Sequence, residues 1–373
     1  MEKYKDMTLK KKTNLKLIRN LIFFVALIIF TFWYIFKDQD LNELKEALSR
    51  ANKAYIILAA LLMLCVHLME SINVRSILTS LGEKNFSIFR ALKYTAIGVF
   101  FSAITPAATG GQPVEIYYMS KDGIKPSNGT MAMLMQLCAF QISTIGLSII
   151  CALLNLHLLQ GNLIWFYILG IVLNGTALTI MLLSVFSKKI TRKLVDILIK
   201  IIKKLKTRNY ELKIQKLEEE YEQYTKSAVF VKTHKKEFLK SLLRVTIQTA
   251  IFHSIPYFIY RAFNLNELTI LNLFTMQAIL YTTVSSIPLP GAIGISETLF
   301  LKLYGSAFGE SILSGAMLLY RFVSFYLYIL IFLIIVIINA IKNKDNDSVI
   351  DKNVQEIDND IKDIKFKKEI FNT

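Results

Sequence analysis

Two stretches of this chain combine helix-breaking residues with a carboxylate that could bind a cation or relay a proton. The breakers of the first stretch are Pro106, Gly110, Gly111 and Pro113, and those of the second are Pro288, Pro290, Gly291 and Gly294. Each stretch ends on a glutamate, Glu115 or Glu297, nine residues after its first proline (115 − 106 = 297 − 288 = 9). Proline removes a backbone donor and glycine weakens a helix, so each stretch predicts an interrupted helix. In a membrane such interruptions are tolerated where they line a cavity, and a pair of them points to a transport site.

Arg321 is the charged residue placed deepest in an apolar stretch, ten residues into the segment 311–341. An arginine at the membrane centre costs about 2.5–3.5 kcal/mol on insertion scales and usually faces the protein interior. Three roles are open to it. It could bind a lipid phosphate through two hydrogen bonds, snorkel to the outer interface, or form an ion pair with Glu297. We favour a role in a site, and that role can include the pair with Glu297.

The other candidate residues each have a structural and a functional interpretation. An acid in the first turn of a helix satisfies free N–H groups, so Glu115 and Glu297 could be caps, or could hold a cationic headgroup or relay protons. Gln112 could bond a headgroup or satisfy the interrupted backbone. Arg75 lies near a predicted helix end, where it could snorkel. The candidate substrate-binding residues are Arg321, Glu115, Glu297, Gln112 and Arg75.

Composition places the chain in a membrane. Its 373 residues are 54% hydrophobic with a mean hydropathy of +0.45, whereas soluble proteins are about 45–50% apolar. Several uncharged runs approach or exceed the roughly 20 residues that cross a bilayer. These runs are 21–36, 55–69, 131–159, 163–186 and 327–341.

Several classes of chemistry have no support in the sequence. The three cysteines lie in apolar runs and the four histidines are scattered, so we expect no metal site. His67, Glu70 and His253 are polar groups near apolar runs, and we expect the two histidines to be packed and hydrogen-bonded. Phosphate loops, nucleophile elbows and HExxH motifs are absent, so we predict no cofactor, no catalytic residue and no ATP-driven transport by this chain alone. The basic charge is concentrated in clusters typical of topology determinants, and we expect no nucleic-acid partner.

These basic clusters orient the chain. Residues 1–20 carry seven Lys/Arg against two acids, and residues 187–240 carry sixteen against seven, which places both in the cytoplasm. Spanning helices then alternate across the membrane, and Lys342 and Lys344 place the C-terminus in the cytoplasm as well. The predicted fold is an all-α polytopic membrane protein with about six full spanning helices and two broken, re-entrant hairpins. The expected spans are 17–36, 54–78, 130–155, 163–186, 241–262 and 311–341.

The same assignment of segments to the two faces of the membrane predicts opposite orientations for the two hairpins. Residues 91–122 must enter and leave on the cytoplasmic face, whereas residues 268–306 must enter and leave on the outer face. Opposite hairpins are the signature of an inverted repeat. Residues 106–115 and 288–297 should therefore meet inside the membrane.

The chain divides into five segments on this interpretation. Within the insert, apolar residues between 190 and 205 follow helical spacing among lysines, which predicts an amphipathic helix on the anionic inner leaflet. Residues 210–231 carry a short heptad seam, which predicts either a helical hairpin that packs on itself or a homodimer contact. The segments are a basic cytoplasmic N-terminus (1–16), a first membrane half (17–186), a cytoplasmic insert (187–240), a second membrane half (241–342) and a charged mobile tail (343–373).

The two interrupted stretches, with Asn73-x-Arg75 and Tyr320-Arg321, resemble the lysylphosphatidylglycerol synthase transmembrane region, a flippase-like integral membrane family. The resemblance covers about 15–342. In multiple peptide resistance factors this region precedes a soluble aminoacyltransferase domain that moves lysine from charged tRNA to phosphatidylglycerol. This chain stops about thirty residues after its last predicted helix, too short for that domain. The resemblance thus implies a place in the cell membrane, a phospholipid partner, a link to antibiotic resistance and a separate aminoacyltransferase.

Three functions are compatible with these observations. The first is movement of an anionic or aminoacylated phospholipid, or a polyprenyl-linked lipid, between leaflets. The second is the phosphatidylglycerol lysyltransferase activity that the family name carries, either in this chain or with this chain as a membrane subunit. The third is a membrane scaffold that assembles through residues 210–231.

Overall fold

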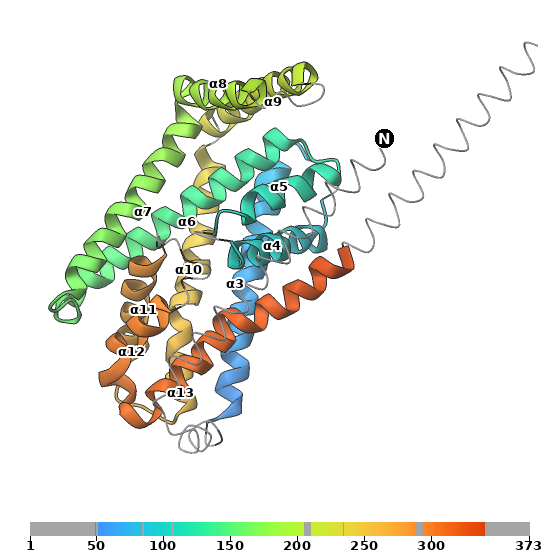
Figure 1. The fold of residues 1–373 in the computed structure, drawn as a ribbon. Coiled ribbons are helices and arrows are strands. Elements are labelled where there is room, and N and C mark those ends of the chain that lie inside the picture. The colour runs from blue at the N-terminus through green and yellow to red at the C-terminus, as the bar shows by residue number, and fades with distance from the viewer. Residues whose placement is uncertain are drawn as a thin grey trace, which may run out of the picture.

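The computed structural model describes residues 51–83, 86–105, 108–204, 210–233, 235–285 and 294–339, with residues 49, 287, 289 and 292. Every regular element in these ranges is helical, which confirms the all-α fold (Figure 1). The α-helices are α3 (Lys53–Ser80), α4 (Ile88–Ala103), α5 (Gly111–Lys121), α6 (Pro126–Leu154), α7 (Leu163–Phe186), α8 (Lys188–Lys204), α9 (Tyr210–Thr233), α10 (Lys235–Ala262), α11 (Ile270–Val284), α12 (Ile295–Phe308) and α13 (Glu310–Arg321).

Four helices in the described part of the chain are long and apolar enough to cross a membrane. They are Lys53–Ser80, Pro126–Leu154, Leu163–Val185 and Glu310–Asn339. The last of them contains α13, a π-helical turn at Phe322–Tyr326, and a helical continuation. Helix α10 has 28 residues, so it matches α3 in length, but its composition is more polar. The protein is therefore a polytopic membrane protein, while the predicted first helix and both chain ends lie outside the described residues.

Both interrupted stretches separate pairs of short helices. Helices α4 and α5 have 16 and 11 residues, and α11 and α12 have 15 and 14. At 1.5 Å per residue none of them spans the roughly 30 Å hydrocarbon core alone. The prediction of two broken hairpins is borne out in this respect.

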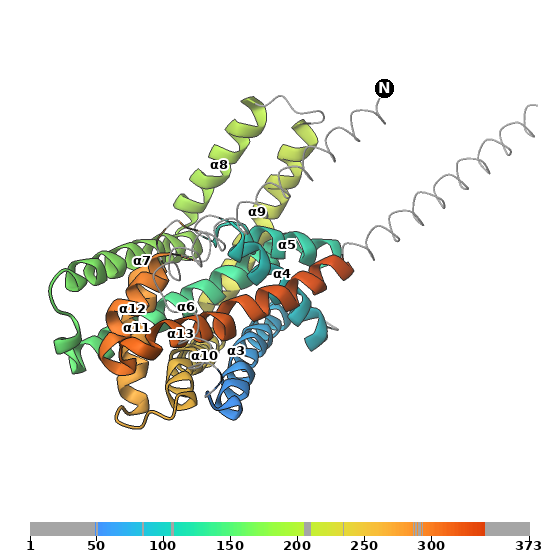
Figure 2. The same ribbon diagram turned by 60° about the horizontal axis from the view of Figure 1, so that its bottom comes forward.

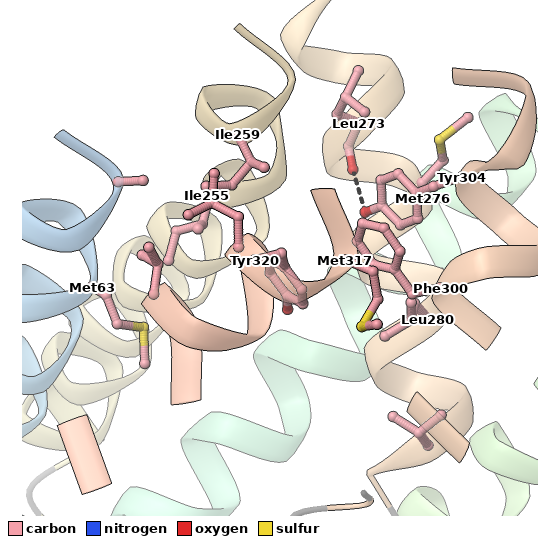
Figure 3. Close-up of a cluster of buried hydrophobic side chains, with 14 of the residues drawn as sticks. Met63, Ile255, Ile259, Leu273, Met276, Leu280, Phe300, Tyr304, Met317 and Tyr320 are labelled. Carbon is pink, nitrogen blue, oxygen red and sulfur yellow. Dashed lines mark hydrogen bonds between the residues drawn. The ribbon is translucent and has the colours of Figure 1, made fainter. Parts of the chain in front are cut away.

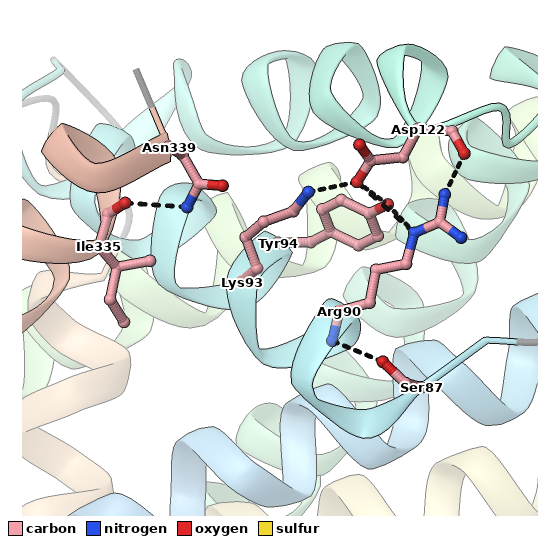
Figure 4. Close-up of polar contacts among 7 residues, drawn as sticks. All are labelled: Ser87, Arg90, Lys93, Tyr94, Asp122, Ile335 and Asn339. Atoms are coloured by element: carbon pink, nitrogen blue, oxygen red, sulfur yellow. Dashed lines mark hydrogen bonds and ion pairs between the residues drawn. The ribbon is translucent and has the colours of Figure 1, made fainter. Parts of the chain in front are cut away.

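A cluster of charged residues joins the two ends of the first hairpin that lie away from the interruption, which we call its base. Asp122, which follows α5, forms ion pairs with Arg90 and Lys93 at the start of α4 and accepts a hydrogen bond from Tyr94 at 2.6 Å (Figure 4). Burial alone would raise the pKa of Asp122, but the bonds from Lys93 and Tyr94 hold that pKa below its usual range. This base lies beside the end of α3, where Arg75 Nε donates to the Phe86 carbonyl oxygen at 2.6 Å.

The base of the second hairpin lies at the opposite end of the bundle. Tyr304 in α12 donates to the Leu273 carbonyl oxygen in α11 at 3.3 Å, and the Phe308 ring packs on Tyr260 near the end of α10. At this end the Asn52 N–H, just before α3, donates to the Ala262 carbonyl oxygen at 2.7 Å. The two hairpins thus enter the bundle from opposite ends (Figure 1). An inverted repeat stays a prediction.

The largest cluster of buried apolar residues joins the second hairpin to α3, α10 and α13. The ring of Phe300 stacks on Tyr304 at 4.2 Å between centroids and on Tyr320 at 5.4 Å (Figure 3). Gln277 Nε2 donates to the Tyr320 hydroxyl at 2.6 Å, which satisfies a polar group inside this apolar layer. The packing holds the residue before Arg321 in a fixed position.

Helices α8 and α9 form the helical hairpin expected within the insert. They lie together at one end of the bundle (Figure 1 and Figure 2). Arg192 of α8 makes two hydrogen bonds to Glu218 of α9, at 2.6 and 2.9 Å. Seam residues Tyr224 and Ala228 are buried, and Tyr224 donates to the Ser184 carbonyl oxygen. The seam therefore packs within the chain at these positions, and a homodimer through 210–231 stays a prediction.

Helix α7 is held against α11 by the close approach of Gly170. A Cβ at this position would lie 2.5 Å from the carbonyl oxygen of Thr282 and 2.9 Å from the Cα of Thr283. We expect Gly170→Ala to lower stability by about 1–3 kcal/mol, because rigid backbone must move. Melting in detergent would measure the loss. The matched control is Gly175→Ala on the same helix, where the Cβ meets nothing within 4 Å, and an equal loss there would contradict the packing argument.

Candidate functional site

A cavity of about 330 Å³ lies between the two interrupted stretches. Residues of the first stretch, Ala108, Gln112 and Glu115, line it together with Leu289, Ala292 and Ser296 of the second. Helices α3, α4, α6, α10, α11 and the last helix complete the wall. The two stretches therefore meet inside the bundle, as expected, and their depth in the membrane stays a prediction.

The last helix places Arg321 in the cavity wall as half of a buried ion pair. Arg321 Nε lies 2.6 Å from Glu297 Oε1, and the two residues are 8% and 1% exposed. The guanidinium also stacks over the rings of Phe325 and Tyr326, at 4.4 and 5.6 Å from their centroids. Of the roles open to Arg321, the structure contains the ion pair with Glu297, and snorkelling to an interface does not fit this burial.

Glu297 also caps the helix that follows the second interruption. Its Oε2 accepts from the Gly294 N–H at 2.6 Å and from Ser296 Oγ at 2.8 Å. Gly294 has a φ of +89°, a conformation that glycine adopts without steric cost, and this turn aims its N–H back at the carboxylate. One oxygen of Glu297 therefore fixes the start of α12 while the other holds Arg321.

Glu115 behaves differently from Glu297. It is the fifth residue of α5, beyond the first turn, so the cap interpretation is wrong for this glutamate. It is 5% exposed and its carboxylate lies directly against Gly98 of α4, where a Cβ would come 2.5 Å from Oε2. No hydrogen bond or ion pair joins Glu115 to another residue in the ranges that the structure describes.

The cavity also contains polar residues outside the initial candidates. Glu70 and His67 of α3 and Gln248 of α10 line it. Each is a polar residue in the middle of a long helix, which is the signal that could have singled them out from the sequence. His67 and His253 are packed against aromatic rings, as expected, but neither ring nitrogen of either histidine has a hydrogen-bond partner among the described residues, so the expected hydrogen bonding is not found there.

The remaining candidates separate into three groups. Gln112 lines the cavity, and Gly110 and Gly111 begin α5 beside it. Arg75 is exposed and bound at the base of the first hairpin, outside the cavity. Pro113 is exposed on the first turn of α5. Pro106, Pro288, Pro290 and Gly291 lie outside the described residues.

Both interruptions contain an alanine in the left-handed region of backbone conformation. Ala108 has a φ of +54° and Ala292 a φ of +50°, and both line the cavity. This conformation costs an L-residue roughly 1–2 kcal/mol and is found where the surrounding structure imposes it, often at functional sites. The strain therefore marks both interruptions as backbone shaped for the cavity.

The site combines two kinds of electrostatic environment within one apolar wall. Arg321 and Glu297 form a neutral pair at the second interruption, whereas Glu115 beside the first interruption and Glu70 of α3 bring two further carboxylates. A guanidinium can bind a phosphate through two hydrogen bonds, and carboxylates can bind a cation. The arrangement suits a polar group carrying both charges inside an apolar environment. No group of three or more His, Cys, Asp or Glu side chains that could hold a metal ion occurs within the described ranges.

Comparison with known proteins agrees with this architecture. A UPF0104 membrane protein of Archaeoglobus fulgidus is 28% identical over 100 residues, a match that covers 27% of this chain and 30% of that protein. The chain thus aligns with under a third of that relative. A family profile described as "Lysylphosphatidylglycerol synthase TM region" matches residues 21–331. This match includes both hairpins, the cavity and Arg321, and the chain belongs to the lysylphosphatidylglycerol synthase transmembrane-region family.

Proposed function

We propose that this protein moves the headgroup of an anionic or aminoacylated phospholipid, of the lysyl-phosphatidylglycerol type, between the leaflets of the cell membrane. The single observation that carries the proposal is the shared cavity, which joins two interrupted hairpins entering from opposite ends of the bundle. A headgroup crossing a bilayer needs polar partners at mid-depth, and interrupted helices supply them in transporters.

The charges in the cavity match such a headgroup. The guanidinium of Arg321 has several N–H donors and can bind a phosphate beside Glu297. The carboxylates of Glu70 and Glu115, which line the same cavity, can bind an amino group. The basic insert at 187–240 supports a cytoplasmic location for α8 and α9, with both chain ends on the same side.

The exposed face of α8 supports contact with the anionic inner leaflet. Leu194, Ile197, Leu198 and Ile201 are each about half exposed, at 46, 52, 48 and 47%. Lysines flank them along the helix, and basic amphipathic helices bind anionic membrane surfaces in this way.

Reconstitution into liposomes tests the proposal. A lipid labelled on its headgroup would be followed by quenching from outside. We expect Glu297→Gln/Arg321→Gln to slow movement of the label at least tenfold, since a hydrogen bond to a charged group is worth about 1.5–3 kcal/mol and tenfold corresponds to about 1.4. Arg261→Gln is the matched control, because Arg261 lies at the end of α10 against Tyr55. Equal rates for wild type and the double variant would remove the ion pair from the transport path.

The family description keeps lipid synthesis as a second candidate function. The chain would then be a phosphatidylglycerol lysyltransferase or the membrane subunit that works with a separate aminoacyltransferase. Lipid analysis after deletion separates the two functions. Loss of the aminoacylated lipid would indicate synthesis, whereas an unchanged total with altered exposure in the outer leaflet would indicate transport.

A further inference from the structure

Two carboxylates face the cavity with no positive charge paired to them. Glu115 is 5% exposed and Glu70 is half-buried, and both line the same cavity. Neither one forms an ion pair or a hydrogen bond within the described part of the chain, and Arg321 is paired with Glu297 instead. The cavity therefore contains two carboxylates that lack a donor in the described part of the chain.

Two other buried groups at this cavity are also unsatisfied. His67 is 4% exposed, and neither of its ring nitrogens has a hydrogen-bond partner among the described residues. Gln248 is 4% exposed as well, and its Oε1 has none. Native proteins satisfy most buried polar atoms, so such a concentration of unsatisfied groups indicates a ligand or water bound between them. This observation is independent of the two acids.

The surrounding helices that the structure describes supply no second cation. Helix α4 contributes Gly98 and Ser102 to this wall, and α10 contributes Gln248 and Thr249. The other titratable groups that face the cavity from the remaining described helices are His67, Tyr281, Tyr320, Arg321 and Tyr328, and Glu297 contacts Arg321. With Arg321 paired to Glu297, the cavity would carry two uncompensated negative charges if both Glu70 and Glu115 were ionised.

A bound proton removes this electrostatic penalty. Two like charges in one low-dielectric site strongly disfavour each other, and one carboxyl group then keeps its proton. A small metal ion is a poorer occupant, because the described residues offer no group of three or more metal-binding side chains. A proton on one of the two carboxylates needs no further ligand.

We propose that Glu70 and Glu115 form a proton-binding site, and that its loading and unloading are coupled to headgroup movement through the cavity. The coupling rests on the function proposed above and adds an energy source to it. Unloading breaks one carboxyl O–H bond and transfers the proton to water, which leaves the pair with one more negative charge. A cationic group entering the cavity replaces that positive charge, and the proton is taken up again when the group leaves.

Infrared spectroscopy of the purified protein tests the proton site without transport. At neutral pH surface carboxylates are ionised, so we expect wild type to show a C=O band of a protonated, buried carboxyl group. Glu70→Gln/Glu115→Gln should lose this band, and Glu222→Gln, which changes an exposed acid on α9, should keep it. Absence of the band in wild type, or its persistence in the double variant, would overturn the site.

Proteoliposomes with an imposed pH gradient test the coupling. Each pH unit changes proton activity tenfold, so we expect the rate of labelled-lipid movement in wild type to change by up to about tenfold per unit. The rate in the Glu70→Gln/Glu115→Gln variant should not depend on the gradient. Wild-type lipid movement that ignores the gradient would overturn the coupling and leave the proposed function standing. If wild type moves no lipid while the infrared band is present, the proposed function fails and the proton site is retained.

Discussion

Replacing Arg321 by alanine is expected to lower the free energy of unfolding by about 3–5 kcal/mol, because Glu297 would remain as an uncompensated charge that is 1% exposed. The loss should exceed that of the packing alone, since Arg321 Nε lies 2.6 Å from Glu297 Oε1. Unfolding in detergent, followed by the fluorescence of the native fold, would measure it.

A double variant separates the charge from the packing. Arg321→Met with Glu297→Gln removes both charges, keeps a long side chain at 321, and leaves an amide oxygen that can still accept from the Gly294 N–H. Buried ion pairs can be replaced by neutral residues at little net cost, so most of the stability should return. If the double variant is as unstable as Arg321→Ala, the ion pair is not the cause of the loss.

Replacing Gly111 by alanine is expected to open the first hairpin and to abolish lipid movement. A Cβ at this position would collide with Ser102 Oγ and lie 2.6 Å from the carbonyl oxygen of Gly98, so α5 would be pushed away from α4. Overpacking of this kind costs about 1–3 kcal/mol, and more where the backbone is rigid. Melting in detergent and the liposome assay would both report the change.

Two further variants test the cause of this effect. Gly146→Ala is the control, because a Cβ there meets nothing within 4 Å. Adding Ser102→Ala to Gly111→Ala removes the hydroxyl but leaves the Gly98 carbonyl oxygen in place. Only part of the stability should therefore return. Complete recovery would show that the side chain of Ser102, rather than the backbone of α4, sets the distance between the helices.

The interrupted hairpins could be predicted from the sequence because their signal is local. Proline and glycine act on the backbone where they stand, and the helices end near them: α4 ends at Ala103 and α5 begins at Gly111. The counts of basic residues predict opposite orientations for the two hairpins. The structure places the two hairpin bases at opposite ends of the bundle. These properties depend little on distant contacts.

The different roles of the two glutamates could not be predicted from spacing. Glu115 and Glu297 lie at equal distances from their prolines, but the helices that contain them begin at unequal distances. Glu297 is the third residue of α12 and reaches the Gly294 N–H, whereas Glu115 is the fifth residue of α5 and turns to Gly98. The exact start of a helix depends on tertiary contacts that the sequence pattern does not contain.

The set of residues that line the cavity also depends on tertiary structure. Glu70 and Gln248 are isolated polar residues on two different helices, and only the contact between α3 and α10 brings them to one wall. Arg75 is a candidate by residue type, but α3 places it outside the cavity, at the base of the first hairpin, where it donates to the Phe86 carbonyl oxygen. Residue type indicates which side chains could form a polar site, and helix packing determines which of them line the cavity.

The π-helical turn after Arg321 has a consequence for how this protein tolerates insertions and deletions. Residues Phe322–Tyr326 place one more residue in the turn than an α-helix would, which rotates everything after it by about 100°. Beyond this turn, Tyr328 donates to the Ala60 carbonyl oxygen at 2.5 Å and Phe332 packs on His67. The alignment of the last helix with α3 is thus encoded by the number of residues in the turn. A one-residue deletion there would change every later contact at once, although each remaining side chain would be unaltered.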